Sequence, residues 1–385
     1  MRPVYGAHMW EAGAEVARPV AADHSAITVK VIHRSASPHL HVVPRSGTLE
    51  CMSTPRLILP SDLELAGQDS RLLTRLCNNG RYFRVRRSVY TEAAEWHALD
   101  EFAQYGLRAA AFTLTTKAPP VFCSSTAALL WGLWITGTQT NLHVVTEQAG
   151  GGRSRGDITR HLGRLDEAVV RCGPLLLTDK LTTTLELITA LKFEQAVAVC
   201  DSSLHLPRYP KPGNIFLPAD VPAGDHDPVW NLNEPQGPPL LKSDLLTAAE
   251  SLPSRSAFNR AVAVIEFASG LSGSAGESLS RVRMAQLGFV APELQHPFTL
   301  RDGREAYVDF WFEKQRKAGE FDGRAKYLRQ DWAGGKSLEE RILDEKNRED
   351  QIRAQSAGFF RWTWREMMDL RGFERLLRQA GIPQK

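Results

Sequence analysis

Four acidic side chains and one lysine follow one another in the C-terminal third of the chain, and Asp309 and Glu320 lie in strand-like segments. In order they are Glu277, Asp309, Glu320, Asp322 and Lys326. A carboxylate in the middle of an aromatic-rich strand is costly to bury unless something pairs with it. Several converging carboxylates usually bind a divalent cation. The order therefore predicts a Mg²⁺ site, which Mn²⁺ could also occupy, for hydrolysis of a phosphodiester.

The predicted roles follow from the negative charge that develops when a phosphodiester is hydrolysed. Asp309 and Glu320 are expected to hold the metal, which would neutralise this charge and lower the pKa of a bound water. Glu277 is expected to supply a third or outer ligand. Lys326 would orient the water or stabilise the transition state. Asp322 completes the candidate catalytic set.

Each of these residues also has an ordinary structural explanation. Asp309 could bond a neighbouring backbone amide at the end of a strand, and Glu277 could serve a capping box that begins at Ser274. Asp322 with Gly323 could form a hairpin turn. The metal hypothesis therefore depends on the joint order of the residues and on their strand contexts.

Hydrophobic periodicity and capping residues predict the elements that must position this site. The expected order is a helix at 274–287, strands at 295–300, 306–312 and 317–322, a charged helix at 338–355, and a strand at 359–364. One helix, three strands, one helix and one strand predict an α/β sandwich with a mixed sheet.

Five short motifs in this region resemble the PD-(D/E)xK superfamily, in the branch similar to very-short-patch-repair endonucleases. They are Glu277 on the first helix, VDF at 308–310, GEFDGRAKY at 319–327, EKNRE at 345–349 and RWTW at 361–364. The resemblance implies a restriction-endonuclease-like three-layer α/β domain. Two residues depart from the pattern: Asp322 replaces the superfamily lysine, and Lys326 stands where the branch often has histidine. A degenerate, non-cutting domain therefore stays open as an alternative.

A second pattern, near the N-terminus, predicts two short helices followed by a strand-rich wing at about residues 56–92. Six arginines lie around the second helix and the wing: Arg71, Arg75, Arg81, Arg84, Arg86 and Arg87. Arginines in such a position can neutralise phosphates and fix the register of a protein on duplex DNA. The alternative is a solvated basic face with no partner.

Residues 56–92 resemble the winged helix-turn-helix that opens AbiEi-type antitoxins of type IV toxin–antitoxin systems. Ser88 stands where glycine is usual in that family, and the segments 124–133 and 181–186 resemble the rest of the antitoxin fold. The resemblance implies DNA as a partner and adds a cognate toxin protein as a second candidate partner.

The 385 residues are therefore expected to form an α+β or α/β multidomain protein. The expected parts are a poorly ordered extension at 1–52, a winged helix-turn-helix at 53–95, an AbiEi-like α/β domain at 96–206, a proline-rich linker or insertion at 207–239, and an endonuclease-like domain at 240–385. Met52 is an alternative start. The linker is predicted because nine of the 22 prolines fall within it.

Composition narrows the class of protein further. Five scattered cysteines without a paired spacing argue against a disulfide framework or a zinc site, and they suit a reducing cytoplasm. The longest apolar stretch, around residues 127–135, is too short to span a bilayer, so no membrane partner is expected. The sequence predicts no oligomeric state.

Three functions follow as hypotheses. The first is a Mg²⁺-dependent DNA endonuclease, targeted by the winged helix and active in defence or genome maintenance. The second is a non-catalytic type IV antitoxin or transcriptional autorepressor with a degenerate nuclease fold. The third is a protein-interaction module that sequesters a toxin.

Overall fold

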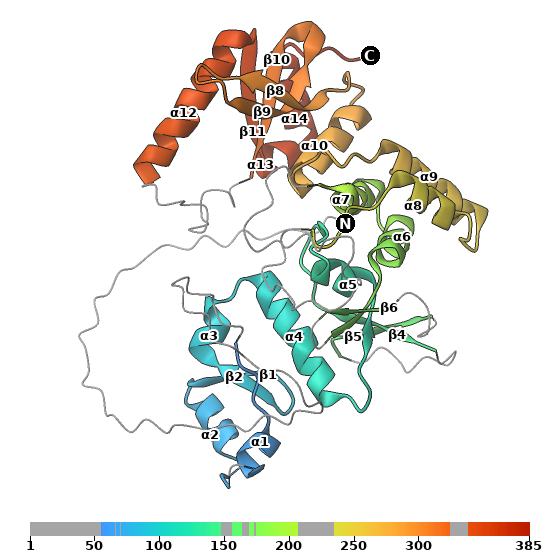
Figure 1. The fold of residues 1–385 in the computed structure, drawn as a ribbon, viewed down its shortest axis with the longest axis vertical. Helices are drawn as coiled ribbons and strands as arrows, with labels where there is room; N and C mark the ends of the chain where they lie inside the picture. The colour runs from blue at the N-terminus through green and yellow to red at the C-terminus, as the bar shows by residue number, and fades with distance from the viewer. Residues whose placement is uncertain are drawn as a thin grey trace, which may run out of the picture.

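The computed structural model describes residues 55–65, 67–69, 71–147, 156–163, 169–172, 175–206, 235–323 and 338–385. The expected N-terminal extension, most of the proline-rich segment and Lys326 lie outside these ranges. The described chain is a mixed α/β protein with two mixed sheets and one two-stranded sheet (Figure 1). None of its helices is long and apolar enough to cross a membrane.

The first unit is small and consists of two helices, a hairpin and a third helix. Its elements are α1 (Pro60–Leu65), α2 (Leu72–Asn78), β1 (Tyr82–Arg86), β2 (Val89–Glu92) and α3 (Ala93–Ala98). The two strands are antiparallel, and Ile58 adds a bridge to Tyr90. Leu63 of α1 and Leu73 of α2 pack with these two residues into one core, which holds both helices against the hairpin.

The turn between β1 and β2 contains a strained backbone position. Ser88 has a φ of 62°, in the left-handed region that favours glycine. We expect Ser88→Gly to stabilise this unit by about 0.5–1 kcal/mol, because relief of the Cβ clash outweighs the added freedom of the unfolded chain. Thermal unfolding of the full chain tests this. Ser251→Gly, at a position without positive φ, is the control and should give no gain.

A five-stranded mixed sheet forms the second unit. Its strands are β3 (Val121–Phe122), β4 (Leu142–Thr146), β5 (Ile158–Leu162), β6 (Val169–Cys172) and β7 (Leu175–Thr178), in the order β5-β4-β3-β7-β6. Helices α4 (Glu101–Thr115) and α5 (Ser124–Leu130) share the core of this sheet. That core includes the fully buried Phe122, Leu142 and Leu177.

Four helices form a layer between this sheet and the C-terminal part of the chain. They are α6 (Lys180–Ala190), α7 (Phe193–Leu204), α8 (Lys242–Ala249) and α9 (Arg255–Phe267). Apolar residues of all four share one core, to which Val282 of the next helix also contributes. By packing, α8 and α9 therefore lie with α6 and α7, and through Val282 the same core reaches α10.

The C-terminal unit has the predicted order of helix, three strands, helix and strand. Its elements are α10 (Ala275–Gln286), β8 (Glu293–Thr299), β9 (Glu305–Phe312), the short 3₁₀ helix η1 (Glu313–Gln315), β10 (Lys317–Asp322), α12 (Leu338–Gln355), β11 (Gly358–Thr363), α13 (Trp364–Met368) and α14 (Leu370–Gln379). The strand order is β11-β10-β9-β8, and only β10 and β11 are parallel. The predicted mixed sheet is confirmed.

Two separate cores cover the two faces of this sheet. Phe310 and Trp362 pack on the face of α10, α13 and α14. Val308 and Phe359 pack with Ile352 of α12 on the other face. The unit therefore has three layers, with the sheet in the middle (Figure 1).

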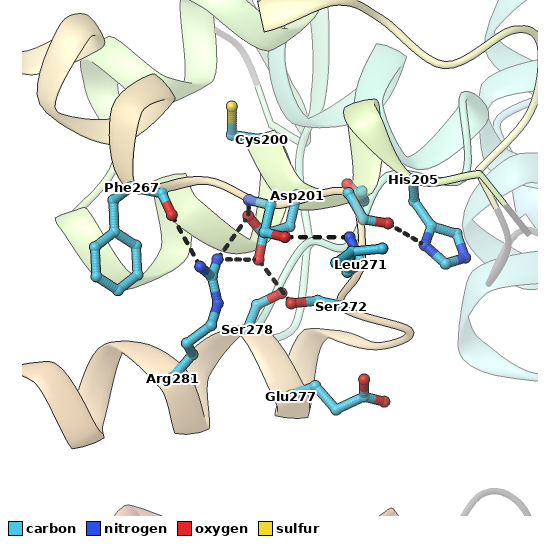
Figure 2. Close-up of polar contacts among 12 residues, drawn as sticks. Cys200, Asp201, His205, Phe267, Leu271, Ser272, Glu277, Ser278 and Arg281 are labelled. Atoms are coloured by element: carbon cyan, nitrogen blue, oxygen red, sulfur yellow. Dashed lines mark hydrogen bonds and ion pairs between the residues drawn. The ribbon is translucent and has the colours of Figure 1, made fainter. Parts of the chain in front are cut away.

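A buried ion pair joins this unit to the helical layer. Arg281 of α10 donates from Nη2 to both carboxylate oxygens of Asp201 on α7, at 3.0 and 2.8 Å (Figure 2). Ser272 Oγ and the backbone N–H of Ser269 also donate to Asp201, which is 0% exposed. Burial raises the pKa of Asp201 although Arg281 opposes that shift. The pair fixes α10, and with it Glu277, against the first half of the chain.

Candidate functional site

Strands β9 and β10 separate at the position of the predicted acids. They pair from Lys317 and Phe312 as far as Gly319 and Phe310, and there the ladder ends. β10 nevertheless continues beside β11 to its last residue, Asp322. We call the opening between the two strands, which begins at Asp309 and Glu320, the β9–β10 fork.

The side chain of Asp309 takes the place of the backbone hydrogen bonds that would continue the ladder between β9 and β10. The backbone N–H of Phe321 donates to its Oδ2 at 2.9 Å, and Gln295 Nε2 lies 3.3 Å from its Oδ1. The ordinary explanation, a bond to a neighbouring backbone amide, is therefore confirmed. The same bond holds the carboxylate of Asp309 against β10 at Phe321, the residue after Glu320.

Gln295 links two of the predicted acids, and the sequence analysis did not single it out. Its Nε2 donates to Glu277 Oε2 at 3.2 Å and to Asp309 Oδ1 at 3.3 Å. Its φ of 55° is unusual for a residue other than glycine. Strained residues of this kind often lie at functional sites, where the surrounding structure holds them in place. No residue type or spacing in the sequence marks this position.

The left-handed backbone at Gln295 lies where strands β8 and β9 change the faces that they present to the two cores. Leu294 and Phe310 pack in the core on the α10 side, whereas Phe298 and Val308 pack in the core on the α12 side. The paired strands β8 and β9 therefore change faces at Gln295 and Asp309. At this point the carboxylate of Asp309 contacts Gln295 of β8 and the Phe321 N–H of β10, next to the end of the β9–β10 ladder.

Glu277 serves the N-terminus of α10 as well as the fork. Its carboxylate accepts the backbone N–H of Gly273 at 2.7 Å and Ser274 Oγ at 2.9 Å, and only 3% of the residue is exposed. The predicted role of Glu277 as a helix-capping partner of Ser274 is therefore confirmed. Its carboxylate points away from the Asp201–Arg281 pair (Figure 2).

Glycine at position 276 lets α10 approach the fork. A Cβ on Gly276 would lie 1.9 Å from the ring of Phe321, closer than any real contact. This close approach of helix and strand sets the first turn of α10, with Glu277, beside β10.

Glu320 lies on the α12 side of the fork in contact with two guanidinium groups. Arg348 of α12 is 2.7 Å from its Oε1 and Arg361 of β11 is 2.9 Å from its Oε2. We call Arg348 and Arg361 the arginine pair. Both arginines also contact Glu345, and Arg361 contacts Glu349. Glu320 is therefore held by charge on both of its oxygens.

The pKa of Arg348 responds to several acids, with Glu320 before Asp309. Burial lowers the pKa of Arg348, but the charge and hydrogen bond of Glu320, and then the charges of Glu345 and Asp309, raise it, and the net direction is upward. A guanidinium that responds to both Asp309 and Glu320 lies near both. The direct partners of the two acids differ, because Asp309 contacts Gln295 and the Phe321 N–H whereas Glu320 contacts the arginine pair. That both carboxylates face one space stays a prediction.

The remaining predicted residues lie partly outside the described ranges. Asp322 is half-buried at the end of β10, opposite Thr363 of β11. Because side chains alternate along a strand, it shares the face of Glu320. Lys326 is not among the described residues, so its predicted role stays a prediction.

The chemistry of the gathered residues suits a hard divalent cation. Glu277, Asp309 and Glu320 offer carboxylate oxygens, the ligand type that Mg²⁺ and Mn²⁺ prefer. In a site ready to bind a metal the carboxylate of Glu320 would be free to coordinate it, whereas here Glu320 is bound to the arginine pair. No group of three or more His, Cys, Asp or Glu side chains within the described ranges is arranged to hold a metal.

The arginines of the first unit divide into two groups. Five are exposed around α2 and the hairpin: Arg71, Arg75, Arg81, Arg84 and Arg87. Arg86 is held inward instead, bound to Asp157 at 2.9 and 3.1 Å and stacked 4.7 Å over the ring of Phe112. Arg86 therefore joins the first unit to the second and is half-buried, whereas the other five are exposed, Arg75 in an exposed ion pair with Asp69.

The structure also brings together two histidines that look isolated in the sequence. His143 on β4 and His161 on β5 are stacked, and Nδ1 of the first lies 2.8 Å from Nε2 of the second. Burial, and then the proximity of His161, lower the pKa of His143 to about 4. Their contact depends on the parallel register of β4 and β5, which the sequence does not reveal.

Comparison with known proteins assigns no family. No protein-family model matches the chain, and no curated protein matches it. The resemblances drawn from the motifs therefore remain predictions.

Proposed function

We propose that this protein is a DNA endonuclease that hydrolyses phosphodiesters with the help of Mg²⁺ or Mn²⁺. The observation that carries the proposal is the β9–β10 fork. There Asp309 is bonded to the amide beside Glu320, and both carboxylates act on Arg348. Two acids from adjacent strands at one opening, with a third on the neighbouring helix, form an arrangement suited to metal-assisted hydrolysis.

In this proposal the residues of the chain have distinct tasks. Asp309 and Glu320 would hold the cation, which supplies neutralisation of the developing phosphate charge and lowers the pKa of a water molecule. Gln295 keeps Asp309 and Glu277 oriented toward each other. The Phe321 N–H fixes Oδ2 of Asp309, and Gln295 Nε2 donates to Oδ1.

The finer fold assignments belong to the same proposal. The order helix, helix, antiparallel hairpin in the first unit supports a winged helix-turn-helix. The three-layer arrangement around a mixed sheet, with the acids where two strands separate, supports an endonuclease-like domain. The five exposed arginines around α2 and the hairpin would bind the phosphates of the target duplex.

The wing arginines give a testable prediction for DNA binding. We expect Arg84→Ala and Arg87→Ala each to weaken binding of a DNA duplex and to reduce the slope of log affinity against log salt by about 0.9, the value for one phosphate contact. Fluorescence anisotropy over a salt series measures both quantities. Arg375→Ala, at an exposed arginine of α14, is the matched control and should leave the slope unchanged.

Cleavage itself is tested with supercoiled plasmid. The pure protein should convert plasmid to nicked or linear forms in Mg²⁺ or Mn²⁺, and EDTA should stop the conversion. Intact plasmid in both metals, at protein concentrations that shift the DNA in a gel, would contradict the proposal.

A second function is supported by one specific observation. Glu320 is already paired with two guanidiniums, which is the arrangement expected of a non-catalytic remnant of a nuclease. In that case the chain would be a DNA-binding autorepressor or antitoxin. It would bind DNA through the first unit, leave plasmid intact, and act with a cognate toxin protein as the antitoxin resemblance implies.

A further inference from the structure

The arginine pair occupies a partly open position at the fork. The side chains of Arg348 and Arg361 are 24% and 27% exposed, whereas that of Glu320 is 12% exposed. The arginine side chains are therefore more exposed than that of the glutamate that they bind. Figure 1 shows α12, which carries Arg348, beside the sheet with one end extending past the strands.

The charges around Glu320 are balanced as they stand. Three carboxylates, of Glu320, Glu345 and Glu349, contact three guanidiniums, of Arg348, Arg361 and Arg353, so the charges of these six groups cancel. If Glu320 left this cluster to bind a cation, one positive charge would remain uncompensated. Each arginine would keep Glu345 as a partner, but the cluster would carry one net positive charge in a half-buried place, which favours an anion in the position of Glu320.

A backbone phosphate of DNA has the properties needed for this exchange. Its single negative charge equals that of Glu320, and its oxygens can accept two parallel bonds from arginine. Arg361 also has a spare donor, because its buried Nε lacks a hydrogen-bond partner among the described residues. The exchange would leave every charge paired: phosphate with the arginine pair, and Glu320 with the cation.

We propose that Arg348 and Arg361 form a phosphate-binding site, and that Glu320 becomes available to a divalent cation only when a DNA phosphate takes its place. This inference rests on the proposed function and adds a regulation to it. Metal and DNA then bind cooperatively, and each must raise the affinity of the other by the same factor. The contact between the arginine pair and Glu320 keeps the metal site closed until substrate arrives.

The test measures Mn²⁺ affinity by isothermal titration, with and without a phosphorothioate DNA duplex that resists hydrolysis. For the wild-type protein, we expect the duplex to tighten Mn²⁺ binding at least about tenfold, within the usual range of coupling between sites. In Arg361→Gln, Glu320 is released from one arginine. Mn²⁺ should then bind more tightly without DNA, and the effect of the duplex should fall below about threefold.

Two further variants keep the result interpretable. Arg348→Gln should reproduce the loss of coupling if Arg361→Gln does not fold. Arg365→Gln, at an exposed arginine next to the network, should behave as the wild type does. Circular dichroism and thermal unfolding check that each protein is folded.

The possible outcomes separate the inference from the proposed function. Equal Mn²⁺ affinity with and without the duplex, in a protein that cuts plasmid, would overturn the inference alone. Absence of Mn²⁺ binding under both conditions, together with intact plasmid, would overturn both. Coupling of equal size in wild type and in a folded Arg361→Gln protein would also reject the role of the arginine pair.

Discussion

Asp309→Asn is expected to abolish plasmid cleavage, with a rate loss on the order of 10²–10³-fold, the size seen when one group that stabilises the transition state is removed. The asparagine keeps a side-chain oxygen to accept the Phe321 N–H, so the fork should keep its shape. The negative charge is lost, and with it the affinity for the cation, and the new amide NH2 no longer accepts the bond from Gln295 Nε2. The rate of plasmid nicking in Mg²⁺ measures the effect.

The matched control for this substitution is Asp302→Asn. Asp302 lies in the exposed turn between β8 and β9, where it contacts only Arg304 among the described ion pairs. It should cleave at the wild-type rate. If Asp309→Asn cut plasmid as fast as Asp302→Asn while both bound DNA equally, Asp309 would have no catalytic role.

Arg281→Met is expected to have the largest effect on stability, a loss of about 3–5 kcal/mol in the free energy of unfolding. The substitution leaves Asp201 fully buried with its charge uncompensated, because the guanidinium supplies two of its hydrogen bonds. Methionine has nearly the length of arginine and limits the packing loss. Urea unfolding followed by circular dichroism measures the change.

Two variants show whether the cost comes from the unpaired charge. Arg283→Met removes an arginine two residues away whose nearest acid, Glu194, is 3.8 Å distant, and it should cost about 1 kcal/mol or less. The double variant Arg281→Met, Asp201→Leu replaces both partners by apolar groups and should recover much of the stability. Equal losses for Arg281→Met and Arg283→Met would argue against the buried pair as the junction.

The order of elements in the C-terminal unit was predictable because its signals are local. Ser274 caps α10 as its side chain indicates, and the apolar period of β9 continues through Val308 to Phe312. The motifs around Asp309 and Glu320 placed both acids on neighbouring strands, and the pairing of β9 with β10 confirms that they are neighbours. Local patterns therefore predicted the elements and the two central acids.

The partners of those acids were not predictable, because they come from distant parts of the chain. Arg348 and Arg361 reach Glu320 only once α12 and β11 are packed on the sheet. Gln295 acquires its role from a backbone conformation that no residue preference indicates. Arg86 was grouped with the DNA-contacting arginines because its partner, Asp157, lies 71 residues further along the chain.

The packing of the middle helices shows the same limit. The cluster of prolines predicts a linker or insertion, but proline content does not say which helices pack together. Leu245 of α8 and Val264 of α9 lie in one core with α6 and α7, which only tertiary structure reveals.

The central claim is that one cation binds between Asp309 and Glu320. The most direct measurement is anomalous scattering at the manganese edge from crystals grown with Mn²⁺ and the phosphorothioate duplex. The claim predicts a manganese peak within about 2–2.5 Å of a carboxylate oxygen of each residue. Bound duplex with Glu320 still on the arginine pair, and no manganese at the fork, would contradict it.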